Sequence, residues 1–328
     1  MIELETRDVN VNGIRLHVTA LGKGPLVLLC HGFPETSHVW RRQLPALAQA
    51  GFRAVAPDLR GYGGSECPSD VAAFTTMDVI GDLVALVESE HAKDAVIVGG
   101  DWGASIAWLA AQLRPDVFRA VAALGVPMMR RAPVMPSRLF PRTESAVFYT
   151  HYFNEPGLAE QEFEQDVSAT LRAIYFAASG QAGPRDDPRT PNPFGMVTNG
   201  QGLLDSLPIP AELPPWLTQS DLDVFVQSFK TSGFRGGLNY YRNLDRNWAL
   251  QAALDGKNVD VPALFLVGER DTGLAIPGMG RIIEAMPDIV PQLRATKMIP
   301  GAGHWLQQEA PQEVNKALVD FLQGNLGS

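Results

Sequence analysis

Apolar residues in the first third of the chain fall into short continuous runs that alternate with amphipathic stretches. Such runs are typical of parallel strands buried on both faces. The expected strands cover residues 26–30, 53–57, 95–98 and 120–125, and the expected helices cover 40–50, 76–91 and 104–113. Ahead of them, Asn12-Gly13 between the runs 9–11 and 14–18 predicts a β-hairpin. This pattern predicts an α/β fold with a mostly parallel, doubly wound sheet.

The pattern changes after Pro127. Between residues 128 and 255 no run resembles a buried parallel strand, whereas helical patterns occur at 158–178 and 221–230 around a Pro-, Gly- and Asn-rich stretch at 180–215. Strand signals return at 261–268 and 297–300, and a helix is expected at 311–322. A segment of this length needs structure of its own. We therefore expect a helical cap domain at 128–255, inserted between core segments 1–127 and 256–328.

Composition narrows the class of protein. A chain of 328 residues with 45% hydrophobic residues can bury a substantial core. Its two cysteines, Cys30 and Cys67, provide neither a disulfide framework nor metal-ligand spacing. Because we find no signal-peptide pattern and no long apolar stretch, we expect a soluble cytoplasmic protein without membrane insertion. The net charge of −9 argues against nucleic-acid binding, which would need a basic face.

The candidate nucleophile is Asp101. It follows a β-branched run that ends in Gly99-Gly100, and Trp102-Gly103 leads from it into a helical pattern. A strand, a sharp glycine-flanked turn and a helix form the context of a nucleophile elbow, which exposes its central side chain above a parallel sheet. Most elbows carry serine. A carboxylate in this position narrows the reactions that the protein could catalyse more than any other residue of the chain does.

A base and an orienting acid are expected downstream, in the order acid and then histidine. Asp271 follows the strand expected at 261–268, and His304 lies in a glycine-flanked turn after the strand expected at 297–300. The carboxyl ends of strands are where such folds place their sites. Glu269 and Asp288 are rival acids. By contrast, His31 in the turn His-Gly-Phe-Pro is expected to hold its loop by hydrogen bonds.

These motifs resemble the epoxide hydrolases of the α/β-hydrolase fold, including bacterial members and the C-terminal domain of the mammalian soluble enzyme. The resemblance extends over almost the whole chain and includes His31 to Glu35, Asp58 to Ser65 and the Asp101 elbow. Two cap segments are more specific, because in this family each carries a tyrosine that hydrogen-bonds the epoxide oxygen. Tyr149 and Tyr241 occupy the matching positions, whereas we expect Tyr152 and Tyr240 only to pack. The loop at 180–215 has no counterpart that we can align.

The resemblance implies a covalent mechanism without metal or organic cofactor. Asp101 would attack the oxirane while Tyr149 and Tyr241 donate hydrogen bonds to its oxygen. His304, oriented by Asp271, would then activate the water that hydrolyses the ester. The backbone N–H groups of the remaining two candidate residues, Phe33 and Trp102, would hold the oxyanion. The expected partners are a small hydrophobic epoxide and water. The oligomeric state stays open, with a homodimer among the options.

Three alternatives remain at this point. A haloalkane dehalogenase shares the aspartate elbow and often the following tryptophan, but it has no use for two phenols. A ligand sensor on the same scaffold is expected to lack a member of the catalytic triad, and here Asp101, Asp271 and His304 are all present. A serine esterase is disfavoured because no serine occupies the elbow.

Overall fold

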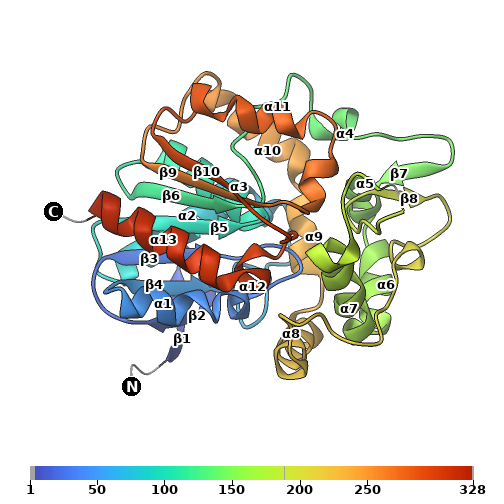
Figure 1. The fold of residues 1–328 in the computed structure, drawn as a ribbon, viewed down its shortest axis with the longest axis horizontal. Helices are drawn as coiled ribbons and strands as arrows, with labels where there is room; N and C mark the ends of the chain where they lie inside the picture. Colours follow the sequence, from blue (N-terminus) through green and yellow to red (C-terminus); the bar gives the residue numbers. More distant parts are fainter. Residues whose placement is uncertain (1–3, 188, 327–328) are drawn as a thin grey trace.

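A computed structural model of the chain describes residues 4–187 and 189–326, and its central feature is an eight-stranded sheet (Figure 1). The strands are β1 (Glu5–Val11), β2 (Ile14–Leu21), β3 (Leu26–Cys30), β4 (Arg53–Pro57), β5 (Ala95–Gly100), β6 (Phe118–Leu124), β9 (Ala263–Gly268) and β10 (Leu293–Ile299). Their spatial order is β1-β2-β4-β3-β5-β6-β9-β10. In this sheet β2 pairs antiparallel with β1 and β4, and the other pairings are parallel. The predicted mostly parallel sheet is confirmed.

Burial explains why the central strands read as continuous apolar runs. Every residue of β3 and β5 is buried, because helices cover both faces of the sheet there. Each large aliphatic side chain buried in this way contributes about 1.5–3 kcal/mol. At the outer edge, β1 and β2 are joined by Asn12 and Gly13, whose φ angles of 46° and 79° match the predicted hairpin turn.

The helices of the two core segments flank this sheet. They are α1 (Gln43–Gln49), α2 (Thr76–Ser89), α3 (Trp102–Leu113), α11 (Met279–Glu284), α12 (Leu306–Glu309) and α13 (Pro311–Leu326). Helices α1 and α13 contact each other on one face, and α2 contacts α3 on the other (Figure 1). The helix predicted at 40–50 is shorter than expected, because residues 37–40 form a 3₁₀ turn before α1 begins.

Most of the described residues between 128 and 255 lie beside the sheet, on the right of Figure 1, whereas residues 244–250 stand near the centre of that view. They form α4 (Pro136–Leu139), α5 (Tyr149–Asn154), α6 (Leu158–Gln165), α7 (Val167–Ala178), α8 (Gln219–Ser232), α9 (Arg235–Arg242) and α10 (Leu244–Leu250), with a two-stranded sheet of β7 (Ala146–Phe148) and β8 (Met196–Thr198). The single helix expected at 158–178 is broken at Asp166, whose side chain accepts the N–H of Ala169 and starts a new helix. The domain boundaries stay a prediction.

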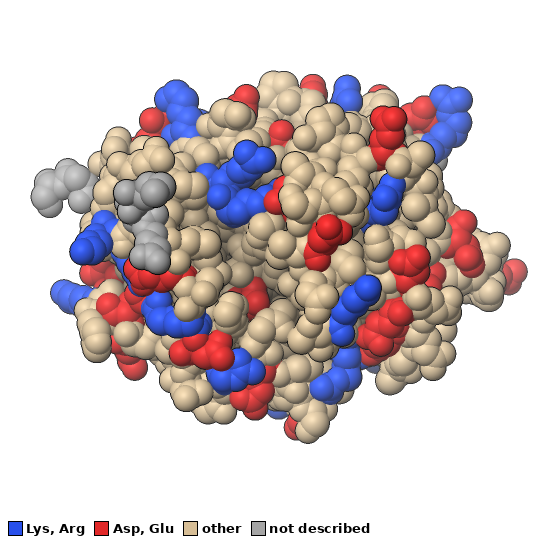
Figure 2. Space-filling view, turned by 90° about the horizontal axis from the view of Figure 1, so that it is seen from below, with Lys and Arg blue, Asp and Glu red and all other residues tan. Residues whose placement is uncertain are grey.

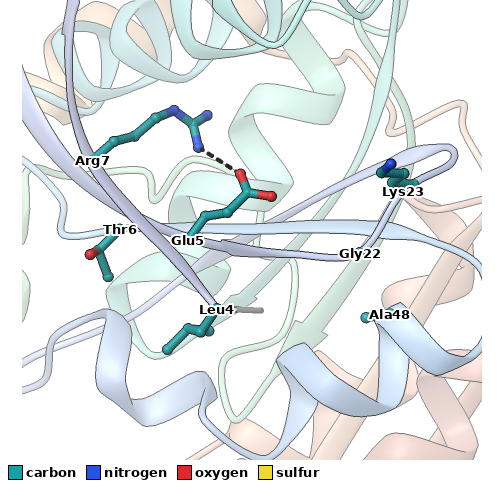
Figure 3. A pocket seen from close by; sticks show the side chains of 7 residues that line it. All are labelled: Leu4, Glu5, Thr6, Arg7, Gly22, Lys23 and Ala48. Atoms are coloured by element: carbon teal, nitrogen blue, oxygen red, sulfur yellow. Dashed lines mark ion pairs between the residues drawn. The ribbon is translucent and has the colours of Figure 1, made fainter. Parts of the chain in front are cut away.

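The surface gives little further indication of function. Acidic and basic side chains are interspersed over the face in Figure 2. A surface hollow of about 910 Å³ lies at the outer edge of the sheet, between β1, the turn after β2 and Ala48 of α1 (Figure 3). None of the predicted catalytic residues lines it. Within the described ranges, no helix is long and apolar enough to cross a membrane.

We predict that Gly103→Ala destabilises the protein by about 1–3 kcal/mol. A Cβ at Gly103 would overlap the carbonyl oxygen of Cys30, so α3 would have to move away from β3. Gly280→Ala in α11 is the matched control, because its added Cβ meets no atom within 4 Å. The control should change the free energy of unfolding by less than about 1 kcal/mol. Urea unfolding of both variants tests this, and equal stabilities would contradict it.

Candidate active site

Asp101 stands at the sharp turn between β5 and α3. Its φ of 53° and ψ of −120° lie in a region that costs a residue other than glycine about 1–3 kcal/mol. Although Asp101 occupies the N-cap position of α3, its side chain makes no capping hydrogen bond. Instead, Oδ1 accepts the backbone N–H of Phe33 at 2.8 Å. The strained turn therefore directs the carboxylate away from the helix and over the edge of the sheet.

His304 lies between two carboxylates. Its Nε2 is 3.2 Å from Oδ2 of Asp101, and its Nδ1 is 3.1 Å from both carboxylate oxygens of Asp271. Asp271 is completely buried and also accepts the N–H of Gly273 at 2.7 Å. The three side chains come from the carboxyl ends of β5, β9 and β10, as parallel topology requires.

The rival acids lie elsewhere. Glu269 accepts the N–H of Gly301 at 2.9 Å, and Asp288 is exposed after α11. Of the acids considered for the partner of His304, the structure brings Asp271 into contact with it.

The two carboxylates control the pKa of His304. Burial alone would lower this pKa, but the charge and hydrogen bond of Asp271, together with those of Asp101, raise it well above the ordinary histidine value. The two carboxylates therefore favour the protonated form of the imidazole in the free protein. Any reaction that removed the charge of Asp101 would also remove part of the stabilisation of that cation.

Tyr149 and Tyr241 approach the same site from α5 and α9. Their ring centroids are 5.8 Å apart with an interplanar angle of 78°, and the ring of Tyr241 is 5.1 Å from that of Trp102. Burial raises the pKa of both phenols, and the negative charge of Asp101 raises them further. Both tyrosines therefore remain protonated and available as hydrogen-bond donors.

The two backbone amides expected to bind an oxyanion, those of Phe33 and Trp102, differ in their contacts with Asp101. The N–H of Phe33 already contacts Asp101, as described above. Trp102 is the first residue of α3, and within the described residues its N–H makes no hydrogen bond to the Asp101 carboxylate. The structure therefore shows one of the two expected donors, the N–H of Phe33, in contact with the Asp101 carboxylate, and the role of the pair stays a prediction.

Residues predicted to have structural roles do make structural contacts. His31 Nδ1 is 2.9 Å from the carbonyl oxygen of Gly32, and its Nε2 accepts the N–H of Leu59 at 3.0 Å. The hydroxyl of Tyr152 donates to Glu162, and that of Tyr240 donates to the carbonyl of Arg60. These tyrosines pack as expected, and each also has a polar partner.

The sequence interpretation gave no role to Glu35, which is fully buried beside the site. Gln307 and Gln308 donate amide hydrogen bonds of 3.2 Å to its Oε1. Burial, assisted by the charge of Asp101, raises its pKa to about 8, so the carboxyl is mostly neutral at pH 7. Its place directly after the Phe33-Pro34 turn was the only signal.

Phe194 was also missed. Its ring lies 5.4 Å from those of both His304 and Tyr149 and so closes one side of the site. It belongs to the Pro-rich stretch that has no regular pattern. Among the described residues, no group of three or more His, Cys, Asp or Glu side chains is arranged to hold a metal ion.

Comparison with known proteins places the chain in a family. A family model described as the alpha/beta hydrolase fold matches residues 25–311. The chain is 44% identical to epoxide hydrolase A of Mycobacterium tuberculosis over 322 residues, which is 97% of each protein. An epoxide hydrolase from an endophytic Streptomyces has a TM-score of 0.93 and 42% identity, over 98% of this chain and 96% of that one. Epoxide hydrolase A from Mycobacterium thermoresistibile gives a TM-score of 0.89 and 40% identity, over 98% and 99% of the two chains. The chain therefore belongs to the α/β-hydrolase fold family and, within it, to the epoxide hydrolases.

Proposed function

We propose that this protein hydrolyses epoxides to vicinal diols and that Asp101 is the nucleophile. The observation that carries the proposal is a carboxylate at the elbow, with a histidine base 3.2 Å from one of its oxygens and two phenols beside it, the buried Tyr241 and the partly buried Tyr149. The names of the relatives support the reaction type. A serine at this position would form an ether that water could not cleave, whereas a carboxylate forms a hydrolysable ester.

In the first step, Asp101 attacks one oxirane carbon. The bond from that carbon to the epoxide oxygen breaks, and its electron pair moves onto the oxygen. Tyr149 and Tyr241 donate hydrogen bonds to this developing alkoxide, and one of the two phenols transfers its proton to it. Because the pKa of both phenols is raised, they are weak acids in the free protein. Loss of the Asp101 charge on ester formation removes one cause of those raised values.

In the second step, His304 removes a proton from water, and the resulting hydroxide attacks the carbonyl carbon of the Asp101 ester. The ester carries no negative charge, so the raised pKa of His304 falls and the imidazole can act as a base. Asp271 holds the Nδ1 proton and stabilises the cation that forms. The N–H of Phe33, assisted by that of Trp102, stabilises the oxyanion. Collapse of this intermediate expels the ester oxygen, which takes the proton that His304 removed from water, and the diol is released. The proton of the freed Asp101 carboxyl then restores the protonation state of the free protein.

The lining favours a small hydrophobic epoxide. The rings of Phe33, Phe153 and Trp102 pack at 4.9–5.5 Å from the ring of Tyr241, and Phe194 covers the side nearest His304. Phe33 and Phe153 are fully buried behind this lining, whereas the partly exposed rings of Trp102 and Phe194 offer apolar contact to the substituents of the oxirane.

We predict that a single turnover in ¹⁸O-water yields unlabelled diol. The oxygen added to the substrate would come from Asp101, and water would instead place its label on the carboxylate. Mass spectrometry of the diol and of the peptide that contains Asp101 measures both. Complete labelling of the first diol would show direct attack by water and contradict the ester mechanism.

We predict that His304→Gln accumulates the ester, because the attack on the oxirane survives while activation of water is lost. The intact protein should gain the mass of one epoxide molecule. His151→Gln is the matched control, since this buried histidine contacts only the carbonyl of Phe140 among the described side-chain bonds. It should turn over without accumulation.

The same base predicts a pH dependence in the unsubstituted protein. Ester hydrolysis should rise with pH as His304 loses its proton, and the midpoint should lie below the pKa of His304 in the free protein. Stopped-flow measurement of ester decay gives the midpoint, and an NMR titration gives the pKa of His304 in the free protein. A midpoint of ester decay at or above the pKa of His304 in the free protein would show that this pKa does not fall when the ester forms.

We predict that Tyr149→Phe and Tyr241→Phe each slow alkylation by about 10²-fold, since removal of one donor to a developing oxyanion has effects of this size. Tyr152→Phe is the control, because its hydroxyl donates to Glu162. Mass spectrometry of the protein, stopped at intervals during a single turnover, measures the rate of this step. Release of halide from haloalkanes, with styrene oxide left intact, would favour a dehalogenase instead.

A further inference from the structure

Arg185 binds several backbone carbonyl groups at once. Its Nε donates to the carbonyl of Arg270 at 2.7 Å, and its Nη1 donates to that of Pro191 at 2.9 Å. Its Nη2 donates to the carbonyls of Ala177 and Ser179 at 3.0 and 2.9 Å. The guanidinium thus joins three separate stretches of the chain. Every hydrogen bond that the structure describes for it ends on a carbonyl oxygen.

Each of these stretches holds part of the base machinery. The carbonyl of Arg270 immediately precedes Asp271. The two carbonyls bound by Nη2 flank Ala178, whose own carbonyl accepts the backbone N–H of His304 at 2.9 Å. Pro191 leads into Phe194, whose ring packs against the imidazole. Arg185 is therefore bonded next to the acid, next to the backbone partner of the base, and next to the ring that covers the base.

The charge of Arg185 is also placed to act on this pair. Burial lowers the pKa of the guanidinium, while the charges of Asp271 and Glu309 oppose that effect and Arg270 adds to it. The interaction between Asp271 and Arg185 is mutual. The cation therefore offsets part of the negative charge that Asp271 presents to His304.

We propose that Arg185 is a positioning residue for the base, which fixes the Asp271–His304 pair through hydrogen bonds to the carbonyls beside it. This inference rests on the proposed function, because it concerns the step in which His304 activates water. Arg185 contacts neither Asp101 nor the two phenols through any described hydrogen bond. Its removal should therefore slow hydrolysis of the ester and leave its formation nearly unchanged.

The test uses Arg185→Met, which keeps much of the apolar stem and removes the charge and all donors. Arg185→Lys restores the charge but can occupy fewer carbonyls. Arg189→Met is the matched control from the same loop, since the Arg189 side chain is 89% exposed and pairs with Asp187. Stopped-flow single turnovers with styrene oxide, followed by mass spectrometry of the protein, give the rates of ester formation and decay separately.

For Arg185→Met we expect ester decay to slow by roughly tenfold or more, since small displacements of catalytic groups have effects of this size. Ester formation should change less than about threefold, which would also show that the variant is folded. Arg185→Lys should recover part of the decay rate. Arg189→Met should match the unsubstituted protein in both steps.

The pH profile of ester decay separates a positioning role from simple loss of stability. Without the guanidinium, Asp271 stabilises the His304 cation more strongly, so the rise of the decay rate should move to higher pH by about half a unit in Arg185→Met. Asp271, Glu309 and Arg270 are the charges that bear on Arg185, and the buried Glu35 also bears on His304. Arg185→Lys should keep the original midpoint, because its charge remains.

Two results would overturn the proposal while leaving the proposed function intact. One is ester decay in Arg185→Met that equals that of Arg189→Met. The other is an equal loss in both steps without a change in the pH midpoint, which would mark Arg185 as a structural residue only. Absence of any ester in the unsubstituted protein would contradict the proposed function itself, and the role of Arg185 with it.

Discussion

The close contact of α3 with β3 forces the chain to turn sharply at Asp101, and the rest of the site is arranged around that turn. Glycine at 103 lets the backbones meet, and the strained φ of Asp101 directs its side chain away from the helix. Parallel topology then places Phe33, Asp271 and His304 after the carboxyl ends of β3, β9 and β10, at the same edge of the sheet. The sheet thus determines where these groups stand, and local strain determines where the carboxylate points.

Not every acidic group around His304 carries a negative charge. Asp101 and Asp271 carry the negative charge that stabilises the imidazolium of His304. Glu35 lies close by, yet burial among two glutamine amides keeps it mostly neutral at pH 7. A third carboxylate anion there would repel Asp101 and disfavour the anionic nucleophile. Neutral phenols and a neutral carboxyl leave the two aspartates as the dominant anions facing the base.

The sequence was sufficient for the sheet and for the residues at its edge, because continuous apolar runs, turn glycines and chain order are local signals. The sequence was insufficient where contacts between residues distant in sequence determine the local structure. The break at Asp166 depends on a cap that competes with an uninterrupted helical pattern. Phe194 and Arg185 lie in an irregular stretch, and their positions follow from carbonyls and rings distant in sequence. Periodicity carries no information about such contacts.

Tyr149 and Tyr241 belong to the segment between residues 128 and 255, whereas Asp101 belongs to the sheet. In the mechanism proposed here, the group that attacks and the groups that receive the departing electron pair are therefore carried by different parts of the molecule. Ring opening can proceed only while those parts are in contact. In that mechanism the carboxylate alone does not suffice for ring opening, because the segment that carries the phenols must also lie against the sheet, as it does in this structure.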